Sequence, residues 1–301
     1  MSKAKPKIAI VGKGAIGSLI AYKCQNQNIE YQLLLKNKLD ITLEIENING
    51  RKTVIHPKNS AITSATNFDI IVLPIKAYQV LGALKQLRHK IQPNHTLVLL
   101  HNGMGTIEQV KLLYPNNPII AATTSYGAFK TTDTSVKETG LGETHLGWVT
   151  SPVSNRNVIE ETLSMLLPPS VWHETIQLAL WKKLAINSAI NPLTAIHNVK
   201  NGVLAEAPYT EILINICSEV SQVLHAEGFN ISPEALLNDV NKVLNTTANN
   251  YSSMHQDVYY KRQTEVEFIN GYVSNKGKQH GISTPANRYL YEEILKLESA
   301  Y

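Results

Sequence analysis

The sequence predicts an α/β protein with a doubly wound parallel sheet in its first part and an all-helical second part. Short apolar runs typical of buried parallel strands recur through the first half of the chain. The first of them, Lys7–Val11, continues directly into a glycine-rich turn, and only helical patterns follow Glu174. The 301 residues suffice for two domains. We place these domains at residues 1–173 and 174–301.

The glycine-rich turn has the G-x-G-x-x-G spacing between a predicted strand and a predicted helix. Gly12 permits the tight turn, Gly14 lets the backbone approach a pyrophosphate, and Gly17 lets the helix pack on the strand. The helix N-terminus adds donors and positive potential for phosphates. A Rossmann-type dinucleotide site is therefore expected, and a tight turn without a ligand is the alternative. The expected cofactor-binding residues here are Gly12, Lys13, Gly14, Ala15, Ile16 and Gly17.

The second predicted strand, Tyr31–Leu35, ends at a basic segment that bears on cofactor choice. An enzyme selective for NAD usually carries an acidic residue near this position for the ribose 2′-hydroxyl. Lys36 and Lys38 stand there instead, and cations favour a 2′-phosphate. NADPH is the expected cofactor, and an exposed basic turn is the alternative.

Later strands in the first domain also end in polar or glycine-rich loops. These strands are predicted at Asp69–Pro74, Thr96–Leu100 and Ile119–Thr124, with shorter ones at Gly140–Thr150 and Val171–Glu174. The loops after the three longer strands place Lys76, Asn102 and Ala128 along the carboxyl edge of the sheet. Ligands of doubly wound folds lie in the crevice at that edge.

Further helices are predicted along the chain, and one of them carries polar residues that packing alone does not explain. The predicted helices are Asn157–Leu166, Trp181–Asn201, Glu206–Gly228, Pro233–Leu244 with Ser232 as N-cap, Thr264–Gly281, and one opened by Pro285. In the second of these, Lys183, Asn187 and Asn191 form one narrow stripe on an otherwise apolar helix. Burying these groups costs several kcal/mol unless each finds a partner, so a polar group is expected against the stripe. An ordinary core helix with its stripe facing water is the alternative, and Pro192 predicts a kink or break.

The helical phase of Thr264–Gly281 places two nearby glutamates in opposite environments. Glu265 shares the inward face with Phe268 and Tyr272, whereas Glu267 points to water. A carboxylate on an apolar face usually needs a cation, and Lys183 lacks a partner. The alternative is that Glu265 lies at a frayed, solvated helix start, where acidic residues are favoured.

Composition limits the class of protein. Hydrophobic residues make up 43% and charged residues 17% of the chain, which indicates an ordered globular protein. The net charge of +4 is too small and scattered for a nucleic-acid surface, but it suits an anionic small ligand. Cys24 and Cys217 form neither a disulfide framework nor a metal spacing, and no apolar run is long enough to span a membrane. We expect a soluble cytoplasmic protein without a metal.

Six segments together resemble the ketopantoate reductase (2-dehydropantoate 2-reductase) family. They are GKGAIG, IKAYQ, HNGMG, WKKLAINSAINPLTAI, SSMHQD and TEVEFINGY. The match runs almost the full length of the chain, in the family's order. The Lys…Asn…Asn-Pro stretch combined with the two later segments is much more specific than the glycine motif.

The resemblance implies a role for each matched residue. Lys183 matches the catalytic lysine, the general acid that protonates the ketone oxygen, and Glu265 matches the glutamate that positions substrate and lysine. The residues matched to substrate binding are Asn102, Asn187, Asn191, Asn201 and Ser253. Asn102, Lys76 and Ala128 also match residues lining the cofactor crevice. Lys36 stands where the family often has an arginine, and lysine binds phosphate without the bidentate fork.

The implied function is NADPH-dependent reduction of ketopantoate to pantoate, a step in pantothenate and coenzyme A biosynthesis. Such an NADP-dependent oxidoreductase has a small-molecule 2-keto acid as its partner, with no nucleic acid and no membrane. One alternative is a reductase of the same fold acting on another 2-keto acid, because the fold alone does not name a substrate. Another is a non-catalytic NADPH-binding regulator. The sequence leaves the oligomeric state open, with a homodimer as one possibility.

Overall fold

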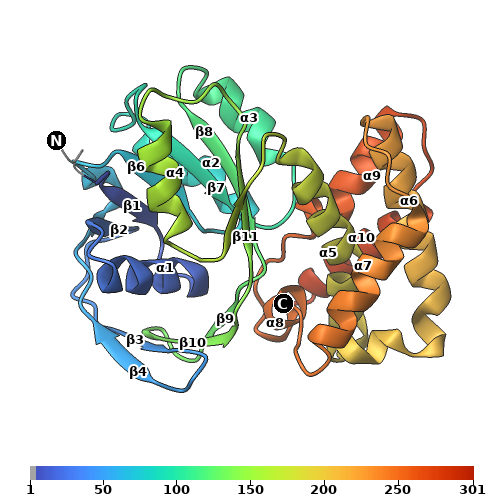
Figure 1. Cartoon of the computed structure of the whole chain (residues 1–301). Coiled ribbons are helices and arrows are strands. Elements are labelled where there is room, and N and C mark those ends of the chain that lie inside the picture. Colours follow the sequence, from blue (N-terminus) through green and yellow to red (C-terminus); the bar gives the residue numbers. More distant parts are fainter. Residues whose placement is uncertain (1–4) are drawn as a thin grey trace. The chain divides into compact units, whose positions relative to one another are not determined.

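The computed structural model describes residues 5–301 and divides into two compact units (Figure 1). The first unit contains the chain up to His101 together with Thr106–Ile176, and the second contains Asn102–Gly105 together with Gln177–Tyr301. The predicted division is a single cut at 173/174, whereas here the main boundary follows Ile176 and four residues of an earlier loop belong with the helices. The Met104 amide fixes that loop there by donating to the carbonyl of Phe268 at 2.8 Å.

An eight-stranded sheet forms the centre of the first unit. Its order is β12 (Ser170–Trp172), β11 (Thr144–Trp148), β8 (Ile119–Thr124), β7 (Thr96–Leu100), β6 (Ile70–Leu73), β1 (Ile8–Val11), β2 (Tyr31–Leu35) and β5 (Asn59–Ala61). All neighbours are parallel except β8 and β11. Every residue of β1, β6 and β7 is buried, which explains their unbroken apolar sequences. The predicted fold class is confirmed.

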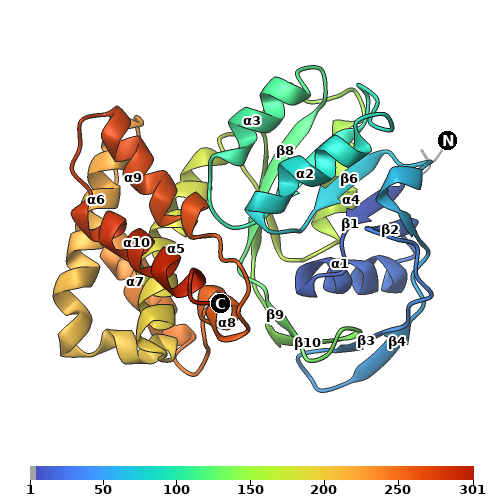
Figure 2. The ribbon, with the colours of Figure 1, turned by 180° about the vertical axis from the view of Figure 1, so that it is seen from behind.

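Helices cover both faces of this sheet (Figures 1 and 2). Helices α1 (Ala15–Asn26) and α4 (Arg156–Ser164) lie on one face, and α2 (Ala77–Leu87) and α3 (Thr106–Leu113) on the other. Alternate residues of β1 serve the two faces: Ile8 and Ile10 pack with α1, and Ala9 and Val11 pack with α2. β1 lies between β2 and β6, so the strand order reverses there, as at the ligand-binding point of doubly wound folds.

A second, four-stranded sheet lies below α1 in Figure 1. Its order is β4 (Lys52–Ile55), β3 (Leu43–Glu46), β10 (Ser135–Gly140) and β9 (Gly127–Lys130). The expectation that Ala128 follows β8 in a loop is wrong, because Ala128 lies in β9 and pairs with Glu138 of β10. The strands of this sheet are only partly buried, so their sequences are not apolar throughout. In β4, for example, Ile55 is the one buried residue. That is why its strands escape an apolar-run prediction.

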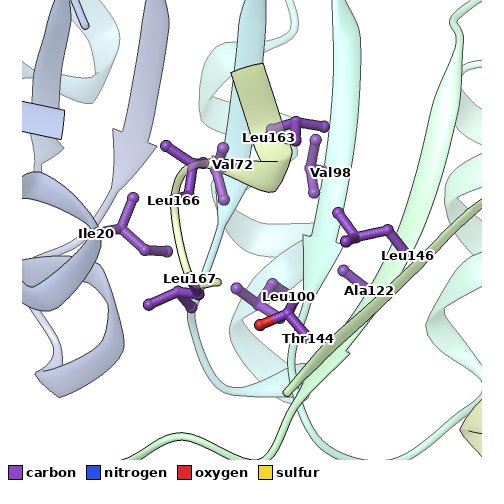
Figure 3. A pocket seen from close by; sticks show the side chains of 10 residues that line it. All are labelled: Ile20, Val72, Val98, Leu100, Ala122, Thr144, Leu146, Leu163, Leu166 and Leu167. Carbon is purple, nitrogen blue, oxygen red and sulfur yellow. The ribbon is translucent and has the colours of Figure 1, made fainter. Parts of the chain in front are cut away.

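A small cavity lies between the eight-stranded sheet and α4 (Figure 3). Its lining is Ile20, Val72, Val98, Leu100, Ala122, Thr144, Leu146, Leu163, Leu166 and Leu167. With a volume of about 20 Å³, it has room for a single water-sized molecule. It is a packing gap in the core and too small for a cofactor.

The second unit is helical and built around α5 (Gln177–His197). This helix packs against α6 (Thr210–Ala226), α7 (Pro233–Thr246), α8 (Ser253–Tyr259) and α10 (Pro285–Glu298). Ser232 caps α7 by accepting from the Ala235 amide, as predicted. The predicted helix Thr264–Gly281 is wrong at its start, because Val266–Phe268 is a 3₁₀ turn (η4) and α9 spans Asn270–Gln279. No helix within residues 5–301 is long and apolar enough to cross a membrane.

The break predicted at Pro192 is absent, and α5 continues as one helix to His197. Proline has no amide hydrogen, so the carbonyl of Ser188, four residues earlier, loses its usual helical donor. Asn270 replaces that donor: its Nδ2 lies 3.0 Å from the Ser188 carbonyl oxygen. A side chain from another helix thus satisfies the group that Pro192 leaves unpaired.

Asn270 belongs to a buried polar network that also caps α10. Asn270 Nδ2 donates to Asn287 Oδ1 at 3.1 Å, and Asn287 Nδ2 donates to Glu219 Oε2 at 2.8 Å. The carboxylate of Glu219 also accepts from the amides of Ala286 at 2.7 Å and Asn287 at 2.9 Å. These amides lie in the first turn of α10, where a negative charge is favourable.

We expect Glu219→Ala to lower the free energy of unfolding by about 3 kcal/mol, because two buried donors and one partly buried donor lose their acceptor. Glu211→Ala is the matched control, since Glu211 is an exposed glutamate on the same helix. It should cost less than about 1 kcal/mol. Denaturant unfolding measures both variants, and equal losses would show that the network does not stabilise the protein.

Candidate active site

The glycine-rich turn joins β1 to α1 with the geometry that a pyrophosphate site needs. Gly12 has φ +85°, a backbone conformation that residues with a side chain rarely adopt. A Cβ on Gly17 would lie 3.0 Å from the carbonyl oxygen of Gly12, so the helix approaches the turn too closely for a larger residue. No side chain within residues 5–301 caps the first amides of α1. These amides are therefore available to phosphate oxygens.

Lys13 and Lys36 provide positive charge around this turn. The Lys13 ammonium donates to the carbonyl of Asp133, in the loop between β9 and β10, at 3.1 Å. Lys36 is the first residue after β2, and it and Lys38 are exposed. Lys76 is the N-cap residue of α2, just beyond β6. β6 neighbours β1, so the turns that carry Lys13 and Lys76 follow adjacent strands.

In the second unit, α5 carries the predicted polar stripe. Asn187 and Asn191 are 7% and 6% exposed, so the alternative of a stripe facing water is wrong for these two residues. Lys183 is half-buried. Its ammonium has no hydrogen-bond or ion-pair partner in the described part of the chain, and burial lowers the pKa of Lys183 below its ordinary value of 10.5.

Two amide atoms of the predicted substrate residues are buried without a partner. Asn187 Nδ2 is an unpaired donor, and Asn201 Oδ1 is an unpaired acceptor, as judged within residues 5–301. Buried polar atoms are normally hydrogen-bonded, so each such exception calls for an explanation. A polar ligand beside these residues would provide hydrogen-bond partners for both atoms.

Ser253 is exposed at the first position of α8, whereas its neighbour Ser252 is buried. Ser252 Oγ accepts from the His255 amide at 3.0 Å and lies 2.7 Å from Thr194 Oγ1. Ser252 therefore connects α8 to the part of α5 that carries Asn191. Sequence reasoning missed Ser252 and Thr194, because their contact spans 58 positions.

The loop Asn102–Gly105 places Asn102 against Glu265. Asn102 Nδ2 lies 3.2 Å from Glu265 Oε2, and Glu265 is only 4% exposed. Gly103 makes the approach possible, since a Cβ there would lie 2.4 Å from the Phe268 carbonyl oxygen. The structure thus brings together two residues predicted from segments far apart in the sequence.

Glu265 and Glu267 have the opposite environments that the sequence predicts. Glu267 is exposed and accepts a hydrogen bond from the hydroxyl of Tyr291, which raises the pKa of Tyr291 to about 12. The expected ion pair between Lys183 and Glu265 is absent from the described residues, because Lys183 has no ionic partner there. No group of three His, Cys, Asp or Glu side chains in residues 5–301 is arranged to hold a metal ion.

The first unit is doubly wound and has a glycine-rich turn before a helix whose N-terminus no side chain caps. The second unit carries a lysine and buried amides on one helix. These features are those of a two-domain oxidoreductase. The family model for ketopantoate reductase PanE/ApbA matches residues 8–150, and the model for its C-terminal part matches residues 175–298. The chain belongs to this family of enzymes.

Individual relatives agree with this assignment. The chain is 38% identical over 295 residues to 2-dehydropantoate 2-reductase of Vibrio cholerae, covering 98% of each chain. It is 35% identical to the enzyme of the same name from Yersinia pestis, covering 98% of this chain and 96% of the relative.

Solved structures share the fold over nearly the whole chain. A ternary structure of D-mandelate dehydrogenase with NADH and anilino(oxo)acetate has a TM-score of 0.89 at 23% identity and covers 98% of this chain and 99% of that one. At this identity the likeness shows the fold alone. A probable 2-dehydropantoate 2-reductase from Bacillus subtilis has a TM-score of 0.80 at 27% identity, covering 97% of this chain and 99% of that one.

Proposed function

We propose that this protein reduces ketopantoate to pantoate with NADPH, and that Lys183 is the general acid. The observation that carries the proposal is the half-buried Lys183 ammonium, which has no partner within residues 5–301 and lies on the same helix as buried amides. Membership of the ketopantoate reductase family supports the choice of substrate.

The proposed chemistry follows from the charge that develops on the substrate. When bound, the nicotinamide supplies the hydride that adds to the keto carbon. Negative charge then accumulates on the ketone oxygen, and a proton donor at that oxygen lowers the barrier. Lys183 donates the proton, and burial favours that donation because it lowers the pKa of the ammonium.

Asn187, Asn191, Asn201 and Ser253 are the proposed substrate-binding residues. The unpaired Asn187 Nδ2 is a donor suited to an oxygen of the keto acid. Glu265 and Asn102 hold each other and form one edge of the proposed site. We assign Glu265 the role of positioning the substrate through this pair.

In the first unit, the open amides of α1 and the backbone from Gly12 to Gly17 would hold the pyrophosphate of the cofactor. Lys13, Lys76 and Ala128 complete the proposed cofactor residues. Lys36 and Lys38 would face the 2′-phosphate, where two cations favour NADPH over NADH.

The direct test is a steady-state assay that follows NADPH absorbance with ketopantoate and with other 2-keto acids. The proposal predicts the highest kcat/KM for ketopantoate. A higher kcat/KM for another keto acid would favour a reductase of the same fold with a different substrate, and tight NADPH binding without turnover of any keto acid would favour a regulator.

Cofactor selectivity should depend on Lys36. We expect Lys36→Asp to erode or reverse the preference for NADPH, because it removes a cation and introduces an acceptor for the ribose 2′-hydroxyl. The ratio of kcat/KM values for NADPH and NADH measures the effect. Lys58→Asp, at another exposed lysine of this unit, is the control and should leave the ratio unchanged. Equal use of both cofactors by the unmodified protein would contradict the assignment.

A further inference from the structure

Backbone contacts fix the chain at Asn201, the first residue of the 3₁₀ turn η2 (Asn201–Ala205). Its backbone amide donates to the carbonyl of Asn250 at 2.9 Å, and the next amide, of Gly202, donates to the carbonyl of Ala248 at 3.1 Å. A Cβ on Gly202 would lie 2.7 Å from the Cβ of Ala248, so this backbone has little room to shift. The backbone position from which the Asn201 side chain extends is therefore set by the fold.

Thr247, at the end of α7, contacts the amide of Asn201. Thr247 Oγ1 lies 2.6 Å from the carbonyl oxygen of Val243 and 2.8 Å from Asn201 Nδ2. A carbonyl oxygen can only accept, so the single hydroxyl proton of Thr247 is used on Val243. Towards Asn201 the hydroxyl can then only accept, and Asn201 must turn its NH₂ group to Thr247.

This requirement fixes which atom Asn201 presents on its other side. With Nδ2 held by Thr247, the atom left is Oδ1, which is buried and has no partner within residues 5–301. Oδ1 is an acceptor and needs a donor. The carboxylate and the ketone oxygen of a keto acid cannot donate, whereas a hydroxyl group can.

We propose that Thr247 is a positioning residue that orients the amide of Asn201 to accept from the substrate's hydroxyl group, and that it thereby sets selectivity for hydroxylated 2-keto acids. The inference rests on the proposed function and extends it to specificity. A site built to bond a substrate hydroxyl discriminates strongly against the analogue that lacks it, since its own polar group is then left unpaired.

The test compares ketopantoate with 3,3-dimethyl-2-oxobutanoate, which differs only by the absence of the hydroxyl. We expect the wild-type protein to favour ketopantoate by at least about 10-fold in kcat/KM. Thr247→Val removes the acceptor and frees the Asn201 amide to rotate. It should lower the ratio of the two kcat/KM values by about 10-fold, mainly through ketopantoate.

Two variants serve as controls. Thr247→Ser keeps the hydroxyl and should retain the wild-type ratio. Thr246→Val removes a neighbouring hydroxyl that bonds the carbonyl of Lys242 at 2.9 Å, and it should also leave the ratio unchanged. Thr247→Ala removes the hydroxyl without adding atoms, so it replaces Thr247→Val if that variant does not fold, and the same loss is expected.

Unchanged discrimination in folded Thr247→Val or Thr247→Ala would overturn the inference while leaving the proposed function intact. Loss of discrimination in folded Thr247→Ser would overturn it as well, because the acceptor is still present. A wild-type protein that does not reduce ketopantoate would instead contradict the proposed function, and the inference with it.

Discussion

Replacing Lys183 with alanine is expected to lower kcat by about 10²- to 10⁴-fold, the usual scale for the loss of a general acid. The ammonium lies on α5 without a partner in the described part of the chain, so its removal breaks no ion pair there. The loss should therefore appear in turnover more than in stability. NADPH affinity should stay near the wild-type value, because the proposed phosphate contacts lie in the other unit.

Lys182→Ala is the matched control for that experiment. Lys182 is the preceding residue, is exposed, and lies 3.5 Å from Asp239 in a surface ion pair. Exposed pairs of this kind contribute about 0–1 kcal/mol to stability, so turnover should be nearly normal. Near-normal turnover of Lys183→Ala, or an equal loss in Lys182→Ala, would contradict the role of Lys183.

Removing the Glu265 carboxylate should be the second severe change. Glu265→Ala leaves Asn102 without the acceptor at 3.2 Å and opens a buried space at the edge of the proposed site. Misplacement of a substrate by about 1 Å can cost 10²-fold, so we expect a loss of that size in kcat/KM. The double variant with Lys183→Ala should be less damaged than the product of the two single losses, because groups that act together are not additive.

Glu267→Ala tests whether the loss of activity in Glu265→Ala comes from the location of that carboxylate or only from the loss of a negative charge. Glu267 lies two residues away and is exposed, and we expect activity close to wild type. The change should instead be seen in the Tyr291 hydroxyl, whose pKa should fall from about 12 towards 10 when its acceptor is removed. Ultraviolet titration of tyrosinate measures that shift. Greater damage from Glu267→Ala than from Glu265→Ala would show that the site is assigned to the wrong face.

Local sequence pattern was sufficient for the central strands of the larger sheet and for the burial of Asn187 and Asn191. Apolar runs predict β1, β2, β6, β7 and β8, because a strand covered on both faces is apolar throughout. Helical periodicity correctly groups Asn187 with Asn191. It also predicts the different exposure of Glu265 and Glu267, although residues 266–268 form a 3₁₀ turn and the helical reason is wrong.

Features that depend on contacts between distant segments leave no local signal. Pro192 predicts a break on local grounds, but Asn270 supplies the missing donor to the carbonyl of Ser188, which lies 82 positions away in the sequence. The Asn102–Glu265 bond spans 163 positions. Helical phase indicates Glu265 and a strand end indicates Asn102, but neither pattern predicts that the two side chains meet. Thr247 reads as an ordinary helix end until its contact with Asn201 is seen.

The pH dependence of ketopantoate reduction tests the central claim most directly. A general acid must be protonated to act, so kcat/KM should fall as pH rises through the pKa of Lys183. Because burial lowers that pKa, the midpoint should lie below 10.5. NADPH affinity, measured over the same range by fluorescence, should not show this midpoint. A rate that stays constant up to pH 10.5, or rises with pH, would contradict the assignment of Lys183 as the proton donor.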